Sequence, residues 1–172
     1  MTAINGISHI AVNTADLGRF RRFYEGVLGL RLGVVALLED APFLRHATLH
    51  VTDGLVLHVF EVPGYDPAAQ GIGKDIGERG RIDHFAFNVP DEAALREVAE
   101  RLRAAGATDG AIRSFGPVLS VHVTDPDGLQ LEVTCPNLTF DPEAPEGEVF
   151  EEVGLPDWFD RMRTAALVSP HP

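Results

Sequence analysis

An α+β fold made of two βαβββ modules is predicted by three features of the sequence. The first is a repeat, in which His9 and Asn13 are matched 75 positions later by His84 and Asn88, with an Ala at the centre of each copy. The second is the order of patterns after each copy, one helical pattern followed by three short apolar strand patterns. The third is an Asp-Gly-Leu turn before the last strand of each half. Such self-similarity indicates duplicated units.

The first module is predicted over residues 4–62. Asp16 is a plausible N-cap, and the apolar residues that follow it recur at helical spacing. Asp53 and Gly54 predict a two-residue hairpin turn between the last two strands. The expected elements are strand 7–13, helix 17–27 and strands 30–38, 44–52 and 55–62.

A Gly- and Pro-rich linker is expected over 63–80, before a second module at 81–135. Asp91 caps its predicted helix. The two modules would form one domain, residues 1–135, with a C-terminal tail at 136–172 that carries a short helix near 155–167. The expected elements of the second module are strand 82–89, helix 92–105 and strands 111–114, 118–124 and 129–134.

Aligning the two halves on Asp-Gly-Leu places His58 opposite Glu132. Side chains alternate between the faces of a strand, so His9, His58, His84 and Glu132 are all predicted on the face away from the helices. We expect a cupped mixed sheet with these four residues in its cavity. Four further side chains are predicted on the same faces as substrate contacts: Asn13, Phe60, Asn88 and Gln130.

The four residues predict a metal site. A carboxylate turned into a concave, partly apolar face is costly without a cation or a donor. Imidazole and carboxylate ligands suit Fe, Mn, Zn or Ni. The alternative is that the same residues line a binding cavity without a metal. Asn13 and Asn88 have two interpretations as well, because they either orient ligands and substrate or simply end their strands.

The two-residue turn also predicts which residues lie away from the site. With that register, Leu49 pairs with His58, and His46 and His50 fall on the opposite face. The repeat places His122 there too. We therefore expect structural or surface roles for His50 and His122. Cys135 is expected to be inert, since no basic cluster beside it favours a thiolate.

Composition narrows the class of protein. The formal net charge of −12 argues against nucleic acid as a partner. No apolar run approaches the ~18 residues of a membrane span, so no membrane contact is expected. The N-terminus lacks a signal-peptide pattern and the single Cys135 cannot form an internal disulfide. We expect a cytoplasmic protein that binds a small molecule and forms a homodimer.

Residues 4–135 resemble the vicinal oxygen chelate superfamily of glyoxalases, bleomycin-binding proteins and extradiol dioxygenases. The resemblance lies in His9, the segment 16–24 with Gly29, His84 and the segment 125–132. It implies paired βαβββ modules around a divalent metal, with His9, His58, His84 and Glu132 at the ligand positions. It also implies that substrates bind through two adjacent oxygens. This sequence departs from isomerase-like members at His58, where they carry Glu or Gln.

The leading functional hypothesis is a single-domain extradiol-type dioxygenase that cleaves a small catechol-like substrate, with Fe(II) as the expected metal and Mn as an option. His9, His84 and Glu132 would be ligands, and His58 a fourth ligand or the catalytic acid/base. The second hypothesis is a glyoxalase- or epimerase-like lyase or isomerase that uses Ni, Zn or Co. The third is a small-molecule binding or resistance protein without turnover.

Overall fold

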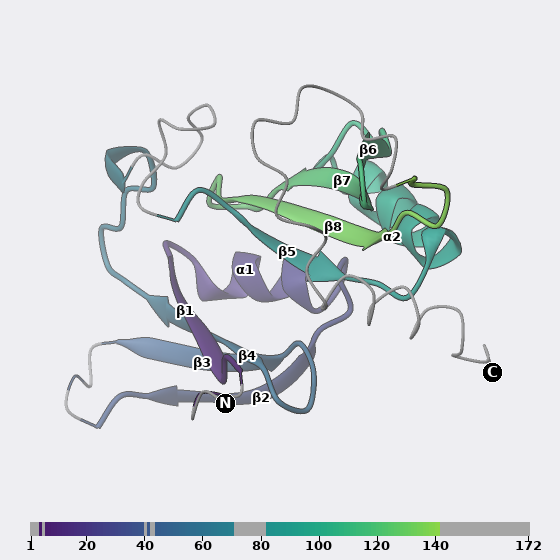
Figure 1. Cartoon of the computed structure of the whole chain (residues 1–172). Helices are drawn as coiled ribbons and strands as arrows, with labels where there is room; N and C mark the ends of the chain where they lie inside the picture. Colours follow the sequence, from purple (N-terminus) through teal and green to yellow (C-terminus); the bar gives the residue numbers. More distant parts are fainter. Residues whose placement is uncertain (1–3, 5, 40, 42–43, 71–81, 142–172) are drawn as a thin grey trace. The chain divides into compact units, whose positions relative to one another are not determined.

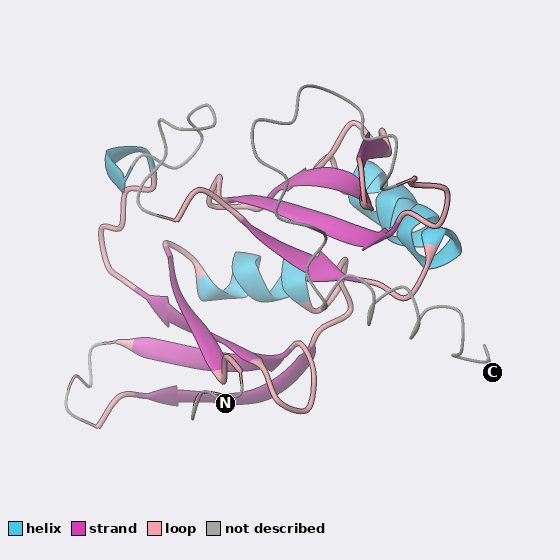
Figure 2. Ribbon diagram, in the orientation of Figure 1, coloured by secondary structure: helices cyan, strands magenta, loops and turns pink. Residues whose placement is uncertain are grey.

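Two compact units, each containing one helix and one four-stranded sheet, make up the chain in a computed structural model. The structure describes residues 4, 6–39, 41, 44–70 and 82–141. Unit 1 comprises residues 1–83 together with 124–129, and unit 2 comprises 84–123 and 130–172. Figures 1 and 2 show the α+β composition that the sequence predicts. The two-module α+β fold is therefore confirmed, while the predicted C-terminal helix at 155–167 lies outside the described residues.

Unit 1 contains a mixed sheet with the strand order β1-β4-β3-β2. β1 runs parallel to β4, whereas β4 and β3, and β3 and β2, are antiparallel. The helix α1 contacts β3 and β4. The elements are β1 (His9–Thr14), α1 (Leu17–Tyr24), β2 (Arg31–Leu37), β3 (Arg45–His50) and β4 (Val56–Glu61), followed by the short 3-10 helix η1 (Ala68–Gln70).

Unit 2 repeats this arrangement with the strand order β5-β8-β7-β6. β5 is parallel to β8, β6 is antiparallel to β7, and α2 packs against β8. The elements are β5 (Phe85–Asn88), α2 (Glu92–Ala104), β6 (Arg113–Phe115), β7 (Val118–Thr124) and β8 (Gln130–Pro136). None of the helices in the described part of the chain is long and apolar enough to cross a membrane.

Both helices begin where the sequence predicts. The Asp16 side chain accepts a hydrogen bond from the Arg19 backbone N–H, and the Asp91 side chain accepts one from Ala94. At the end of α2, Gly106 takes a positive φ of 71°, which an L side chain would resist. The α1 helix ends at Tyr24 and is shorter than the predicted 17–27.

Each core lies between a helix and one face of its own sheet. In unit 1, Leu57 and Val59 of β4 are fully buried, as are Phe20 and Tyr24 of α1. In unit 2, the equivalent buried residues include Leu95 and Leu102 of α2 and Leu131 and Val133 of β8. Since alternate residues of β4 and β8 fill these cores, His58 and Glu132 must lie on the other faces.

The connection between β3 and β4 differs from the predicted two-residue turn. His50 pairs with Val56, so residues 51–55 form the connection, and the backbone N–H groups of Val51 and Thr52 both donate to the Leu55 carbonyl. Leu49 consequently pairs with Leu57 instead of His58. A shift of one residue in the register exchanges the faces of a strand. The predicted orientation of β3 was therefore wrong, because the turn is longer than its Asp-Gly pair indicates.

Candidate functional site

On β1, His9 and Asn13 lie on the sheet face of unit 1 that points away from α1. The parallel register pairs Ala11 with His58 and Asn13 with Phe60, so these side chains share one face of the sheet. The His9 and His58 rings lie 6.3 Å apart between centroids in an edge-on arrangement. The alternation along the strands predicts this face for His9, Asn13, His58 and Phe60. The roles of these residues in binding stay predictions.

His46 joins this face, contrary to the prediction. The register of β3 and β4 pairs His46 with Phe60 and Thr48 with His58. His46 Nδ1 lies 2.9 Å from His58 Nε2, within hydrogen-bond distance. His50, two residues beyond Thr48, is on the same face, so both β3 histidines were placed on the wrong side by the assumed turn. Unit 1 therefore gathers imidazoles from three adjacent strands.

The surroundings of His58 favour the neutral form of its ring. Burial, and then the neighbouring His46 and His9 rings, lower the pKa of His58 below its usual value. The Phe60 ring, 4.3 Å from the His58 ring between centroids, contributes an apolar surface beside it. A neutral imidazole has a lone pair that can bind a metal or accept a proton.

Unit 2 has its polar groups around Glu132 on β8. Glu132 Oε1 lies 3.3 Å from His84 Nε2 and 3.4 Å from His122 Nε2. Its other oxygen, Oε2, accepts a hydrogen bond of 2.9 Å from the hydroxyl of the buried Ser120. The carboxylate side chain is 19% exposed. His122 was predicted on the opposite face, and its approach to Glu132 corrects that prediction for the same reason of strand register.

Two buried ring nitrogens have no hydrogen-bond partner within the described part of the chain, His50 Nδ1 and His122 Nε2. His122 Nε2 is close to Glu132 Oε1 but is not aligned for a hydrogen bond. A buried polar atom left without a partner costs about 1–3 kcal/mol. Such an atom beside a carboxylate fits a site that a bound cation would complete.

The remaining predicted contact residues lie on the same face of unit 2. Ala86 pairs with Glu132, and Asn88 follows it by two residues on β5. Gln130 precedes Glu132 by two residues on β8, so alternation places it beside the carboxylate. The structure thus assembles the predicted quartet as two pairs, His9 with His58 in unit 1 and His84 with Glu132 in unit 2.

The candidate ligands are three imidazoles and one carboxylate, which are groups that bind divalent cations. Among the residues that the structure describes, however, no group of three or more His, Cys, Asp or Glu side chains is close enough to hold a metal. The two pairs of candidate ligands belong to different units.

A buried carboxylate cluster in unit 1 was missed by the sequence analysis. Asp127 accepts hydrogen bonds from the Thr14 hydroxyl (2.5 Å), the Ala15 backbone N–H (3.2 Å) and Arg19 Nη2 (2.6 Å). Asp125 accepts one from the Tyr24 hydroxyl at 3.0 Å. These aspartates belong to the β7–β8 turn, which packs in unit 1 although both strands belong to unit 2. The only sequence signal was the presence of two acids in one turn.

Burial shifts the pKa values of three titratable groups. It raises the pKa of the Asp125 carboxyl and raises the pKa of the Tyr24 hydroxyl well above its usual value. In unit 2, Cys135 is fully buried on β8 and has its pKa raised to about 11, mainly by burial. A thiol with such a pKa is protonated at neutral pH and is a poor nucleophile, as predicted from the sequence.

The chain contains two βαβββ modules, and each has polar side chains on the sheet face opposite its helix. This places the protein in the class of duplicated α+β folds. The Glyoxalase/Bleomycin resistance protein/Dioxygenase superfamily model matches residues 6–133. The chain belongs to this family.

One sequence relative is MhqA of Bacillus subtilis (strain 168), a protein named as a ring-cleaving dioxygenase. It is 28% identical over 135 residues, which cover 77% of this chain and 40% of the relative. The chain thus spans less than half the length of that protein.

Solved structures share the fold at lower identity. A glyoxalase/bleomycin resistance protein/dioxygenase domain from Frankia sp. EAN1pec has a TM-score of 0.65 and 23% identity, with 78% of this chain and 100% of that chain covered. A lactoylglutathione lyase from Agrobacterium tumefaciens has a TM-score of 0.53 and 22% identity, with 77% and 95% covered. Proteins with different chemistry therefore share this fold, and only the site residues can separate them.

Proposed function

We propose that this protein is a metal-dependent dioxygenase that cleaves a small catechol-like ring bound through two adjacent oxygens. His9, His84 and Glu132 would hold the metal, with Fe(II) first and Mn(II) second among candidates. The bound metal would supply Lewis acidity toward both substrate oxygens and redox chemistry with dioxygen. The relative named as a ring-cleaving dioxygenase supports this choice of chemistry.

The observation that carries the proposal is the state of Glu132. It is the one carboxylate on the site faces of β1, β3, β4, β5, β7 and β8. One of its oxygens accepts a hydrogen bond from Ser120, and the other lies 3.3 Å from His84 Nε2. An isomerase needs a carboxylate free to take a proton from carbon and return it. A carboxylate held in this way suits a ligand better than a mobile base.

The proton chemistry falls to the His58–His46 pair. Their ring nitrogens are 2.9 Å apart, so one of them donates the shared proton and the other accepts it. A catechol-like substrate must lose its hydroxyl protons to bind through both oxygens. His58 would take one of these protons at a ring nitrogen and share it with His46. Asn13, Phe60, Asn88 and Gln130, on the same faces, are the proposed substrate contacts.

The remaining expectations belong to the same proposal. The domain would occupy residues 1–135, act in the cytoplasm as a homodimer and bind neither nucleic acid nor membrane. The lyase or isomerase alternative with Ni, Zn or Co has the fold of the lactoylglutathione lyase in its favour. Because that likeness concerns the fold alone, the arrangement of Glu132 is our reason for placing the dioxygenase first.

The test begins with protein purified without chelators, followed by metal analysis and anaerobic loading with Fe(II). Addition of a catechol panel with air should consume oxygen and produce a coloured ring-cleavage product. His9→Ala and Glu132→Ala should lose both bound metal and oxygen uptake. Glu100→Ala, which breaks an exposed ion pair with Arg103 on α2, is the matched control and should keep both. Turnover of a hemithioacetal by the Ni form without oxygen uptake would refute the dioxygenase assignment.

A further inference from the structure

The edge strand β6 carries two side chains on the Glu132 face of unit 2 that the proposed chemistry does not use. The register pairs Arg113 with Ser120 and Phe115 with Val118. Residues that are directly paired across two strands point to the same face of the sheet, and the Ser120 hydroxyl donates to Glu132. Arg113 and Phe115 therefore lie on the face that holds Glu132.

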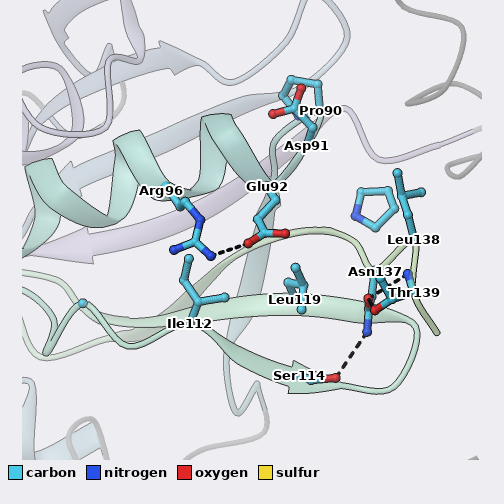
Figure 3. A pocket seen from close by; sticks show the side chains of 12 residues that line it. Pro90, Asp91, Glu92, Arg96, Ile112, Ser114, Leu119, Asn137, Leu138 and Thr139 are labelled. Carbon is cyan, nitrogen blue, oxygen red and sulfur yellow. Dashed lines mark hydrogen bonds and ion pairs between the residues drawn. The ribbon is translucent and has the colours of Figure 1, made fainter.

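The residues between them on these strands point the other way. Figure 3 shows Ser114 of β6 and Leu119 of β7 on the wall of a separate hollow of about 510 Å³, which reaches to the first turns of α2. Consecutive side chains on a strand point to opposite faces. The position of Ser114 and Leu119 in this hollow thus supports the assignment of Arg113 and Phe115 to the Glu132 face.

Phe115 gives this face an aromatic surface close to the candidate ligands. Its ring is parallel to the ring of His122, with an interplanar angle of 3° and centroids 5.5 Å apart. His122 Nε2 in turn lies 3.4 Å from Glu132 Oε1. Since Phe115 is 48% exposed, part of its ring is open to solvent and can be covered by a flat ligand.

Arg113 is the only Lys or Arg on the site face of the described strands of unit 2. Its Nη2 donates to Asp109 Oδ2 at 2.6 Å, and its Nη1 donates to the Ala111 carbonyl at 3.3 Å. The pKa of Asp109 is lowered first by its hydrogen bonds from Arg113 and Ala111 and least by the His122 charge, so the ion pair lies near that ring. A guanidinium has five N–H donors, which leaves Arg113 with donors for a ligand.

The separation between Arg113 and Glu132 suits a single small ligand. The strand order β8-β7-β6, with Ser120 in between, puts the two residues in one row across the sheet. Neighbouring strands are about 4.8 Å apart, so the backbones of β6 and β8 are about 10 Å apart. A benzene ring with two adjacent oxygens at one end and a carboxylate at the other can bridge a metal held by Glu132 and the guanidinium of Arg113.

We propose that the substrate is an aromatic diol that carries a carboxylate, with Arg113 binding the carboxylate and Phe115 stacking on the ring. The inference rests on the proposed function, because it takes the diol to bind at the candidate metal ligands. A carboxylate accepts two parallel hydrogen bonds from a guanidinium, which favours it over a neutral substituent. The Asp109 side chain is 58% exposed, so solvent screens its repulsion of the anion while it holds Arg113 in place.

The experiment measures binding without turnover, by isothermal titration calorimetry of the full chain in the absence of air. The two ligands are protocatechuate and its neutral amide. The acid should bind about tenfold more tightly than the amide, and Arg113→Gln should remove this preference. Phe115→Leu should weaken the binding of both ligands several-fold and keep their ratio. Arg96→Gln, which breaks an exposed ion pair beside the hollow on the other face, is the matched control and should keep the preference.

Equal affinity for the acid and the amide, or no binding of either, would overturn the proposal, as would a preference that survives Arg113→Gln in a variant that circular dichroism shows to be folded. Oxygen uptake with neutral catechols and no preference for the acid would keep the dioxygenase and remove the carboxylate subsite. A preference that depends on Arg113, without oxygen uptake by the Fe(II)- or Mn(II)-loaded protein, would keep the subsite and refute the dioxygenase.

Discussion

Replacement of the buried Asp127 by Ala should destabilise the protein by about 3 kcal/mol. Its carboxylate, with the side chain 2% exposed, accepts three hydrogen bonds. Those from Thr14 and Ala15 should contribute about 1–1.5 kcal/mol each, because a charged acceptor strengthens them. Arg19 is 44% exposed and can turn to solvent, so its ion pair adds only about 0.5 kcal/mol.

Urea unfolding followed by far-UV circular dichroism measures this effect. With a slope of about 2 kcal/mol per molar urea, the midpoint should fall by about 1.5 M. The control is Glu100→Ala, which removes an exposed pair with Arg103 and should change stability by less than about 0.5 kcal/mol. A loss for Asp127→Ala below about 1 kcal/mol, or equal to that of the control, would refute the buried-cluster reasoning.

Three further predictions concern titratable groups. Tyr24→Phe removes the buried hydroxyl that donates to Asp125 and should cost about 1–2 kcal/mol in urea unfolding; an unchanged midpoint would contradict this. His46→Ala removes one cause of the low pKa of His58, so NMR titration of the metal-free protein should find the pKa of His58 higher in the variant, and a fall would count against the contact. Because the pKa of Cys135 is raised to about 11 from a usual 9, its contribution to stability is present below pH 9 and lost as the pH rises through 11. Unfolding at a series of pH values should show this loss, and Cys135→Ala should reduce it.

The site faces of β1, β4, β5 and β8 could be predicted from the sequence because each strand carries its own alternation. Buried residues such as Leu57 and Leu131 mark the inner face, so His58 and Glu132 must lie on the other. The repeat extended this reasoning from one module to the next. Helix starts were equally local, since an N-cap Asp bonds to a backbone N–H three residues away.

β3 and β7 were predicted with the wrong face toward the site. In β3 the face was taken from the assumed turn, and not from the alternation of His46, Thr48 and His50 with Ala47 and Leu49, which are buried. The connection of residues 51–55 is longer than Asp53-Gly54 indicates, and it brings His46 to His58. The close approach of β2 to β3 at Gly33 was not visible in the sequence either. A side chain at Gly33 would collide with Thr48 across the irregular β2–β3 pairing.

The sequence by itself determined the duplicated α+β architecture, the helix starts and the faces of four strands, because these follow from contacts between near neighbours and from a pattern that occurs twice. Only the tertiary structure revealed that His46 and His122 join the candidate site, and that the β7–β8 turn buries Asp125 and Asp127 in unit 1. The physical reason is that strand register and the burial of a turn depend on how distant segments pair. Local side-chain patterns do not specify that pairing.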